Sequence, residues 1–261
     1  MNVQHYYVDS ELNDDSAYKQ AMKFACELAN KDAKIKRVVL LAITKKNVDW
    51  LERAFDSKTV KDLFQGSRFK GCNPLYKIET VKTYKEQYRN PEDLVITMAL
   101  DDKDVLPLND MLSVIAIIAI PWQQSGLKQY LETWNPIEIR SNKNFKTEVA
   151  EPNCIVKKAL EQLTKSINLS NGINHHSDNE RAKTTIRALH KYETNLNADL
   201  VKGYLTRELG WENDVADDLT KLIRTLNAGK YFKGGETSGL QNHYKTWKQK
   251  CEKINNKNNI G

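Results

Sequence analysis

Apolar residues in the first half of the chain fall into two kinds of spacing. Continuous aliphatic runs occur at Val38–Ile43, Leu94–Leu100 and Val114–Ile120, and such runs are typical of strands that a parallel sheet buries on both faces. Between them, apolar residues recur every three or four positions, as in amphipathic helices. Residues 1–140 therefore predict an α/β fold with a Rossmann-like, doubly wound, mainly parallel sheet.

Weaker patterns complete this half of the chain. Ser16 or Asp15 is expected to cap its first helix, and Asn47 its second. The patterns predict strands at Val3–Val8, Leu75–Tyr84 and Ile137–Ile139, the last at an edge, and helices at Ala17–Leu28, Val48–Phe55, Val60–Gly66, Leu106–Leu112 and Leu127–Trp134.

After Arg140 the strand patterns stop. We expect a polar linker at residues 141–150, a small helical domain at residues 151–229, and a basic tail with a C-terminal helix at residues 230–261. Ser177 and Glu180 have the spacing of a capping box at one helix start. Helical faces are predicted at Val156–Leu163, Ala182–Leu189, Leu200–Leu209, Val215–Leu226 and Leu240–Ile254.

Charge and cysteine content narrow the class of protein. The net charge is +6, but residues 230–261 hold seven lysines and two glutamates, so the rest is nearly neutral. The longest apolar run, Val114–Ile120, is too short for a membrane span, and the first residues do not form a secretory signal. The four cysteines lack metal-binding spacing and indicate no disulfide scaffold; they predict a reducing, cytoplasmic location. They are Cys26, Cys72, Cys154 and Cys251.

The loops that follow the predicted strands form the first candidate site. Ligands of doubly wound sheets bind beyond the carboxyl ends of the strands, and lysines beside a helix start suit an anion. The chain lacks both common phosphate-loop motifs. Its opening, a strand followed by Asp9-Ser10 and a capped helix, resembles universal stress proteins and related nucleotide-binding folds over residues 1–45, without their late glycine signature. The candidate ligand-binding residues are Asp9, Ser10, Thr44, Lys45, Asn47, Asp101, Asp102 and Trp122.

A second polar cluster lies in the helical half. We prefer structural capping as its role, because adjacent histidines point apart and no third metal ligand stands at fixed spacing. The second candidate site comprises Asn168, Ser170, His175, His176 and Asp178.

A nuclease site at Glu79 and Lys82 is disfavoured, since their spacing places them on opposite faces of a strand.

The C-terminal part allows two interpretations. Leu200–Gly235 has the order of a winged helix, but acidic residues at the start of its second helix would repel DNA. In the tail, Lys230, Lys233, Lys245 and Lys248 could contact nucleic acid. Alternatively, the spacing of apolar residues indicates that a final helix docks on the body of the protein. We prefer this second interpretation. The residues with this spacing are Tyr244, Trp247, Cys251 and Ile254.

These patterns favour a non-catalytic regulatory or accessory protein. It would sense a small anionic or nucleotide-like ligand and contact a protein partner, without a membrane partner or a metal. One alternative is an enzyme acting on nucleotides or nucleic acid through Asp9, Asp101 and Asp102. The other is a nucleic-acid-binding protein that uses the basic tail.

Overall fold

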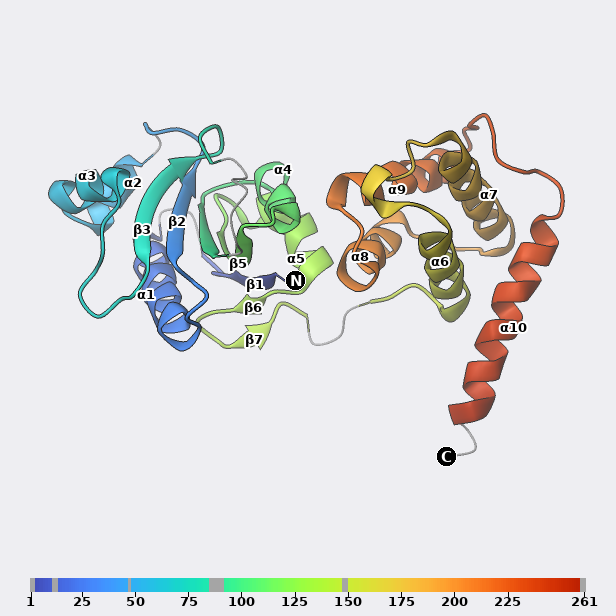
Figure 1. Cartoon of the computed structure of the whole chain (residues 1–261), viewed down its shortest axis with the longest axis horizontal. Helices are drawn as coiled ribbons and strands as arrows, with labels where there is room; N and C mark the ends of the chain where they lie inside the picture. Colours follow the sequence, from blue (N-terminus) through green and yellow to red (C-terminus); the bar gives the residue numbers. More distant parts are fainter. Residues whose placement is uncertain (1–2, 11–13, 47, 85–91, 147–149, 259–261) are drawn as a thin grey trace. The chain divides into compact units, whose positions relative to one another are not determined.

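A computed structural model gives the fold of the chain, and it describes residues 3–10, 14–46, 48–84, 92–146 and 150–258. The chain divides into two compact units, Met1–Glu148 and Val149–Gly261. The first unit is coloured blue to green in Figure 1, and the second olive to red. Each unit has its own buried core.

A seven-stranded sheet forms the centre of the first unit. Its strand order is β3-β2-β4-β5-β1-β6-β7, and the paired strands are parallel except for the β6–β7 pair. The predicted central strands β2, β4 and β5 are adjacent, parallel and almost wholly buried, which confirms a mixed α/β unit with a mostly parallel sheet. The strands are β1 (Gln4–Tyr7), β2 (Arg37–Ala42), β3 (Leu75–Thr80), β4 (Asp93–Met98), β5 (Val114–Ile120), β6 (Ile137–Glu138) and β7 (Lys143–Asn144).

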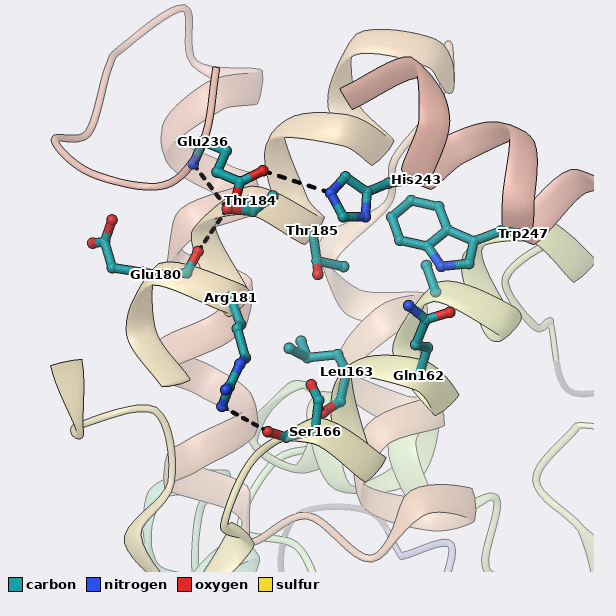
Figure 2. A pocket seen from close by; sticks show the side chains of 11 residues that line it. Gln162, Leu163, Ser166, Glu180, Arg181, Thr184, Thr185, Glu236, His243 and Trp247 are labelled. Carbon is teal, nitrogen blue, oxygen red and sulfur yellow. Dashed lines mark hydrogen bonds and ion pairs between the residues drawn. The ribbon is translucent and has the colours of Figure 1, made fainter. Parts of the chain in front are cut away.

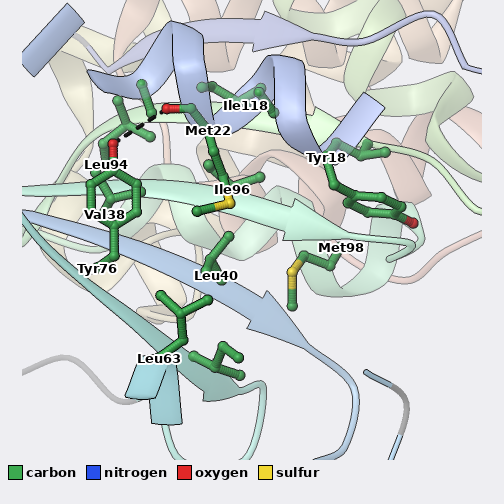
Figure 3. Close-up of a cluster of buried hydrophobic side chains, with 14 of the residues drawn as sticks. Tyr18, Met22, Val38, Leu40, Leu63, Tyr76, Leu94, Ile96, Met98 and Ile118 are labelled. Atoms are coloured by element: carbon green, nitrogen blue, oxygen red, sulfur yellow. Dashed lines mark hydrogen bonds between the residues drawn. The ribbon is translucent and has the colours of Figure 1, made fainter. Parts of the chain in front are cut away.

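Helices cover both faces of this sheet. Successive side chains of a strand point to opposite faces, so Val38 and Leu40 join one core cluster while Val39 and Leu41 join another. Figure 3 shows the first cluster, where Met22 of α1 packs over the strands. That face carries α1 (Asp15–Lys31), α2 (Asp49–Ala54) and α3 (Ser57–Gln65); the other carries α4 (Asp102–Val105), η1 (Leu106–Asp110), η2 (Gln124–Leu127) and α5 (Lys128–Trp134).

Several predicted boundaries of this unit are wrong. Asp14 caps α1, because its carboxylate accepts from the Ser16 backbone N–H at 3.1 Å and from the Ser16 hydroxyl at 2.5 Å. The predicted cap Asn47 lies outside the described residues. Strand β3 ends at Thr80, since hydrogen bonds between Thr80 and Thr83 close a turn there.

The strand predicted at Ile137–Ile139, β6 in the structure, is not an edge strand. β6 pairs with β1 on one side and antiparallel with β7 on the other. Because β7 comprises Lys143–Asn144, the polar segment that the sequence predicts as a linker begins inside the sheet. Its polar composition reflects a solvent-exposed edge, since both residues of β7 are exposed.

The second unit is helical among its described residues. Its core includes the fully buried Trp211 and Trp247. Gly210 ends α8 in the left-handed conformation, with φ at 68°, where glycine has no steric penalty. The elements are α6 (Cys154–Ser166), η3 (Leu169–Asn171), α7 (His176–Tyr192), α8 (Ala198–Leu209), α9 (Asn213–Asn227) and α10 (Leu240–Asn258).

The C-terminal helix belongs to the core of this unit. Leu240 and Trp247 of α10 are buried in it, and the Tyr244 hydroxyl donates to Glu193 at 2.8 Å. The preferred docking interpretation of the tail is therefore confirmed for these residues. The side chain of Ile254 lies outside the described part of the chain.

All four cysteines are paired, contrary to the expectation of a chain without a disulfide framework. Cys26 bonds to Cys72 and Cys154 bonds to Cys251, so each unit contains one disulfide. The partners are 46 and 97 positions apart, and only folding brings such distant residues together. The argument from the cysteines to a reducing compartment therefore fails. Among the described residues, no helix has both the length and the apolar composition required to cross a membrane.

Candidate functional site

The carboxyl edge of the sheet gathers most of the first candidate residues. Parallel pairing aligns the ends of four strands, as the register shows for Tyr7 with Ala119, Met98 with Ile120 and Leu41 with Thr97. Asn47 lies outside the described residues. The candidate residues at this edge are Asp9 and Ser10 after β1, Thr44 and Lys45 after β2, Asp101 and Asp102 after β4, and Trp122 after β5.

The direction of the connections reverses at two positions of this edge, where doubly wound sheets have their ligand crevices. β1 and β2 lead to helices on one face, whereas β4 and β5 lead to helices on the other. Neighbouring strands whose connections leave to opposite faces create the positions where open α/β sheets bind ligands. These positions lie between β1 and β5 and between β2 and β4.

Large apolar and basic side chains are exposed on the loops of this edge. Trp122, two residues after β5, is 53% exposed, and Ile43, directly after β2, is 46% exposed. Lys45 and Lys46 are also exposed. Ala99, at the end of β4, has a φ of 55°, a conformation that residues with a Cβ seldom adopt. The edge therefore exposes one aromatic side chain and two lysines, together with the acidic Asp9 and Asp101.

Some of the acidic candidates at this edge have structural roles. Both carboxylate oxygens of Asp102 accept backbone N–H groups at the start of α5, from Gln129 and Tyr130, at 2.8 Å each. The neighbouring Asp101 lies so close to Gly126 that a Cβ there would be 2.5 Å from its Oδ1 atom. Asp101 and Asp102 thus sit against the β5–α5 connection, and a side chain at position 126 would displace the Asp101 carboxylate.

Arg140 holds the loop after β1. Its guanidinium donates to the Asp9 carbonyl at 2.8 Å and to the Asp14 carboxylate at 2.5 Å. Burial opposes ionisation of Asp14, but hydrogen bonds from Ser16 and Arg140 outweigh it and lower the Asp14 pKa. Glu138 accepts from the Ser141 backbone N–H at 2.5 Å and so fixes the start of the next segment.

The second candidate cluster is a network of structural hydrogen bonds. Asn168 caps η3 by accepting from the Ser170 N–H at 3.1 Å. The buried Asp178 accepts from the Asn168 N–H at 3.3 Å and from Arg181 at 2.9 Å. His175 precedes α7, and its Nδ1 lies 2.9 Å from the Ser177 hydroxyl. His176 is exposed in the first turn of α7.

The predicted capping box at Ser177 and Glu180 is wrong. His175 occupies the cap position of α7, and no side-chain hydrogen bond caps that helix. Glu180 instead accepts the Gly235 N–H at 2.6 Å, which lowers the Glu180 pKa. A contact with a segment 55 positions away has therefore replaced the local one.

The segment before α10 is an anchored loop rather than a wing. Residues 231–239 contain no strand in the structure. Arg187 of α7 donates to the Phe232 carbonyl at 2.6 Å and lies 4.6 Å and 4.5 Å from the ring centres of Tyr231 and Phe232. The four candidate nucleic-acid contacts of the tail are exposed, namely Lys230, Lys233, Lys245 and Lys248.

A cavity that the sequence analysis missed lies within the helical unit. It is partly open to solvent and has a volume of about 320 Å³, and Figure 2 shows the side chains that line it. The walls come from α6, α7 and the segment 236–247, so the lining residues are scattered in sequence and no local motif marks them. They are Ala159, Gln162, Leu163, Ser166, Glu180, Arg181, Thr184, Thr185, Glu236, His243 and Trp247. The described residues contain no group of three or more side chains placed to hold a metal.

The comparison with known proteins found a similarity in the helical unit alone. Residues 152–248 are similar to a family described as "Domain of unknown function (DUF1889)". No curated protein and no solved structure matches the chain. Every residue that lines the 320 Å³ cavity lies inside the matched segment. The cavity is therefore built entirely from the part of the chain that resembles this family.

Proposed function

We propose that the protein is a non-catalytic regulatory or accessory protein whose α/β unit binds a small anionic, nucleotide-like ligand. The observation that carries this proposal is the exposed Trp122 at one crevice of the sheet edge, with Lys45 and Lys46 exposed at the other. Aromatic side chains stack on bases, and lysines neutralise phosphates. The proposed arrangement is Rossmann-like, with the ligand lying across the strand ends.

The spacing of the strands supports one ligand that reaches both crevices. β4 separates β5 from β2, and neighbouring strands lie about 4.8 Å apart, so the two strand ends are roughly 10 Å apart. A nucleotide can place its base near Trp122 and its phosphates near Lys45 over such a distance. Lysine side chains would then replace the glycine-rich phosphate loop that the sequence lacks.

The hydrogen bonds that Asp102 makes favour a binding function over the enzyme alternative. Its two oxygens already accept the free N–H groups of α5, whereas an acid or base in catalysis must be able to reach a substrate proton. The helical unit, with the exposed lysines of α10, would contact a macromolecular partner. We propose a protein partner first and nucleic acid as the alternative.

Isothermal titration calorimetry with AMP, ADP, ATP and inorganic phosphate tests the ligand site. We expect Trp122→Ala to weaken nucleotide binding about tenfold, because one stacked base contributes roughly 1–3 kcal/mol. Lys45→Ala should weaken phosphate-bearing ligands in proportion to their charge. Lys23→Ala is the matched control, since that lysine is exposed on α1 away from the strand ends.

Two results would contradict the proposal. One is that the wild-type protein binds none of these compounds at millimolar concentration. The other is that Trp122→Ala and Lys45→Ala bind them as tightly as Lys23→Ala does.

A further inference from the structure

We propose that the cavity between α6, α7 and α10 is a second ligand site, and that it takes a small zwitterion, a free amino acid. This site lies in the helical unit and is independent of the sheet edge. Its volume of about 320 Å³ is at the lower end of the range for small-molecule pockets, roughly 300–1,000 Å³.

Charges of opposite sign stand at different parts of the cavity wall. Figure 2 shows Glu236 and His243 together at one end and Arg181 and Ser166 at the other, with Leu163 and Thr185 between them. Arg181 is held in place because its Nη1 donates to the Ser166 carbonyl and to Asp178, at 2.9 Å each. A guanidinium has five N–H donors, so Arg181 retains donors for a carboxylate.

At the end of the cavity that holds Glu236, a backbone hydrogen bond fixes this residue and its carboxylate is a hydrogen-bond acceptor. The Glu236 N–H donates to the Thr184 hydroxyl at 2.8 Å, which anchors this residue beside the cavity. Its carboxylate lies 3.7 Å from His243 Nε2, too far for a normal hydrogen bond. The other acid in the wall, Glu180, already accepts from Gly235 and Lys183. The Glu236 side chain is 67% exposed, and its carboxylate can therefore turn towards a ligand ammonium group.

Trp247 provides an independent indication that the cavity is built for a ligand. Its side chain is only 2% exposed, and among the described residues its Nε1 has no hydrogen-bond partner. A buried N–H without a partner costs roughly 1–3 kcal/mol, which a ligand oxygen would remove. In Figure 2 the indole nitrogen is on the side facing Gln162. Because Gln162 Oε1 accepts from Lys250 at 2.8 Å, the NH2 group of Gln162 remains as a second donor.

These groups select for a ligand with both charges. In Figure 2 Trp247 Nε1 faces Gln162, so these two donors suit a carboxylate, and Glu236 with the Thr185 hydroxyl suits an ammonium group. A nucleotide would bring several negative charges towards Glu236 and Glu180, and like charges repel. An amino acid carries one charge of each sign and is small enough for the volume. The site therefore differs in ligand chemistry from the proposed anion site.

Calorimetric titration of the full-length protein with each proteinogenic amino acid tests the proposal. We expect at least one to bind with a Kd below about 1 mM, and its N-acetylated and amidated forms to bind at least tenfold more weakly. Glu236→Gln should weaken binding about tenfold, and Trp247→Phe, which keeps an aromatic ring, about fivefold. Glu252→Gln is the matched control, because Glu252 is an exposed glutamate of α10 outside the cavity.

The proposal is overturned if no amino acid binds, if the blocked forms bind equally well, or if Glu236→Gln behaves like Glu252→Gln. Circular dichroism of each variant shows whether it is folded, and a folded Glu236→Gln suffices for the decision if Trp247→Phe is not folded. Trp122→Ala should leave amino-acid binding unchanged. Failure of this site is thereby distinguishable from failure of the nucleotide site.

Discussion

The disulfide between Cys154 and Cys251 makes a sharp prediction about α10. The bond joins the first residue of α6 to α10 and closes a loop of 97 positions. The chain-entropy relation for such a loop gives about 4.7 kcal/mol of stabilisation at 25 °C. Cys251→Ser removes this constraint but leaves Leu240 and Trp247 in the core. We therefore expect α10 to remain docked and to open far more often.

Hydrogen–deuterium exchange read by mass spectrometry measures this opening directly. A loss of about 4.7 kcal/mol corresponds to an increase of about three orders of magnitude in the open population of α10. Exchange of the α10 amides should accelerate by up to this factor, both in Cys251→Ser and in wild-type protein treated with reductant. In denaturant, unfolding of the helical unit should begin at a lower concentration.

Cys26→Ser is the control for this measurement. It breaks the disulfide of the α/β unit, whose 46-position loop gives about 4 kcal/mol by the same relation. Its effect should stay within that unit and leave the α10 amides unchanged. The reasoning fails if native protein purified without reductant titrates four free thiols, or if reductant leaves exchange in α10 unaltered. Four free thiols would instead support the cytoplasmic location.

Three further predictions concern buried charge, pH and the tail. Asp93→Ala should lower the free energy of unfolding by about 3–5 kcal/mol in urea, because it leaves Arg37 without the buried carboxylate it contacts at 2.5 Å and 2.7 Å; an unchanged urea midpoint would exclude this pair as a stabilising contact. Burial lowers the pKa of His5 from 6.5 to about 3, so the unfolded chain takes up a proton that the folded chain does not, and stability should fall as the pH drops from about 6.5 towards 3. His5→Phe should flatten this dependence in urea midpoints measured across that range, and an equally steep dependence would contradict the assignment. If α10 binds single-stranded nucleic acid, Lys245→Glu with Lys248→Glu should reduce the salt dependence of binding by about one unit of slope per lost phosphate contact; wild-type protein that shows no binding at low ionic strength excludes this function.

Deletion of the tail is a poor test of nucleic-acid binding, because the tail contributes to the core of the helical unit. From the sequence, deletion of residues 236–261 is the natural way to ask whether the tail binds nucleic acid. In the structure, that deletion removes the buried Leu240 and Trp247 and the disulfide partner Cys251. Loss of binding would then report a damaged core. Charge reversal at the exposed lysines tests the same idea without touching the packing.

The sequence by itself determined the elements that depend on local patterns. The aliphatic runs at β2, β4 and β5 can be stable only if both faces are covered, and this requirement predicts their adjacent, central, parallel positions. Helical spacing likewise predicted the face of α10 that carries Trp247. The same patterns predict where the strands end and therefore place four loop residues at one edge of the sheet, namely Asp9, Lys45, Asp101 and Trp122. The register of the strands agrees with this placement.

Tertiary structure alone decided the interactions between distant residues. Glu180 has a possible partner three residues before it, but the Gly235 N–H reaches its carboxylate and a local capping box does not form. The cysteines pair over 46 and 97 positions, and the helical cavity combines residues from three segments. A local pattern records what a residue can do with its neighbours in sequence. Which distant group competes for the same hydrogen bond, or lines the same cavity, depends on how the helices and strands pack together.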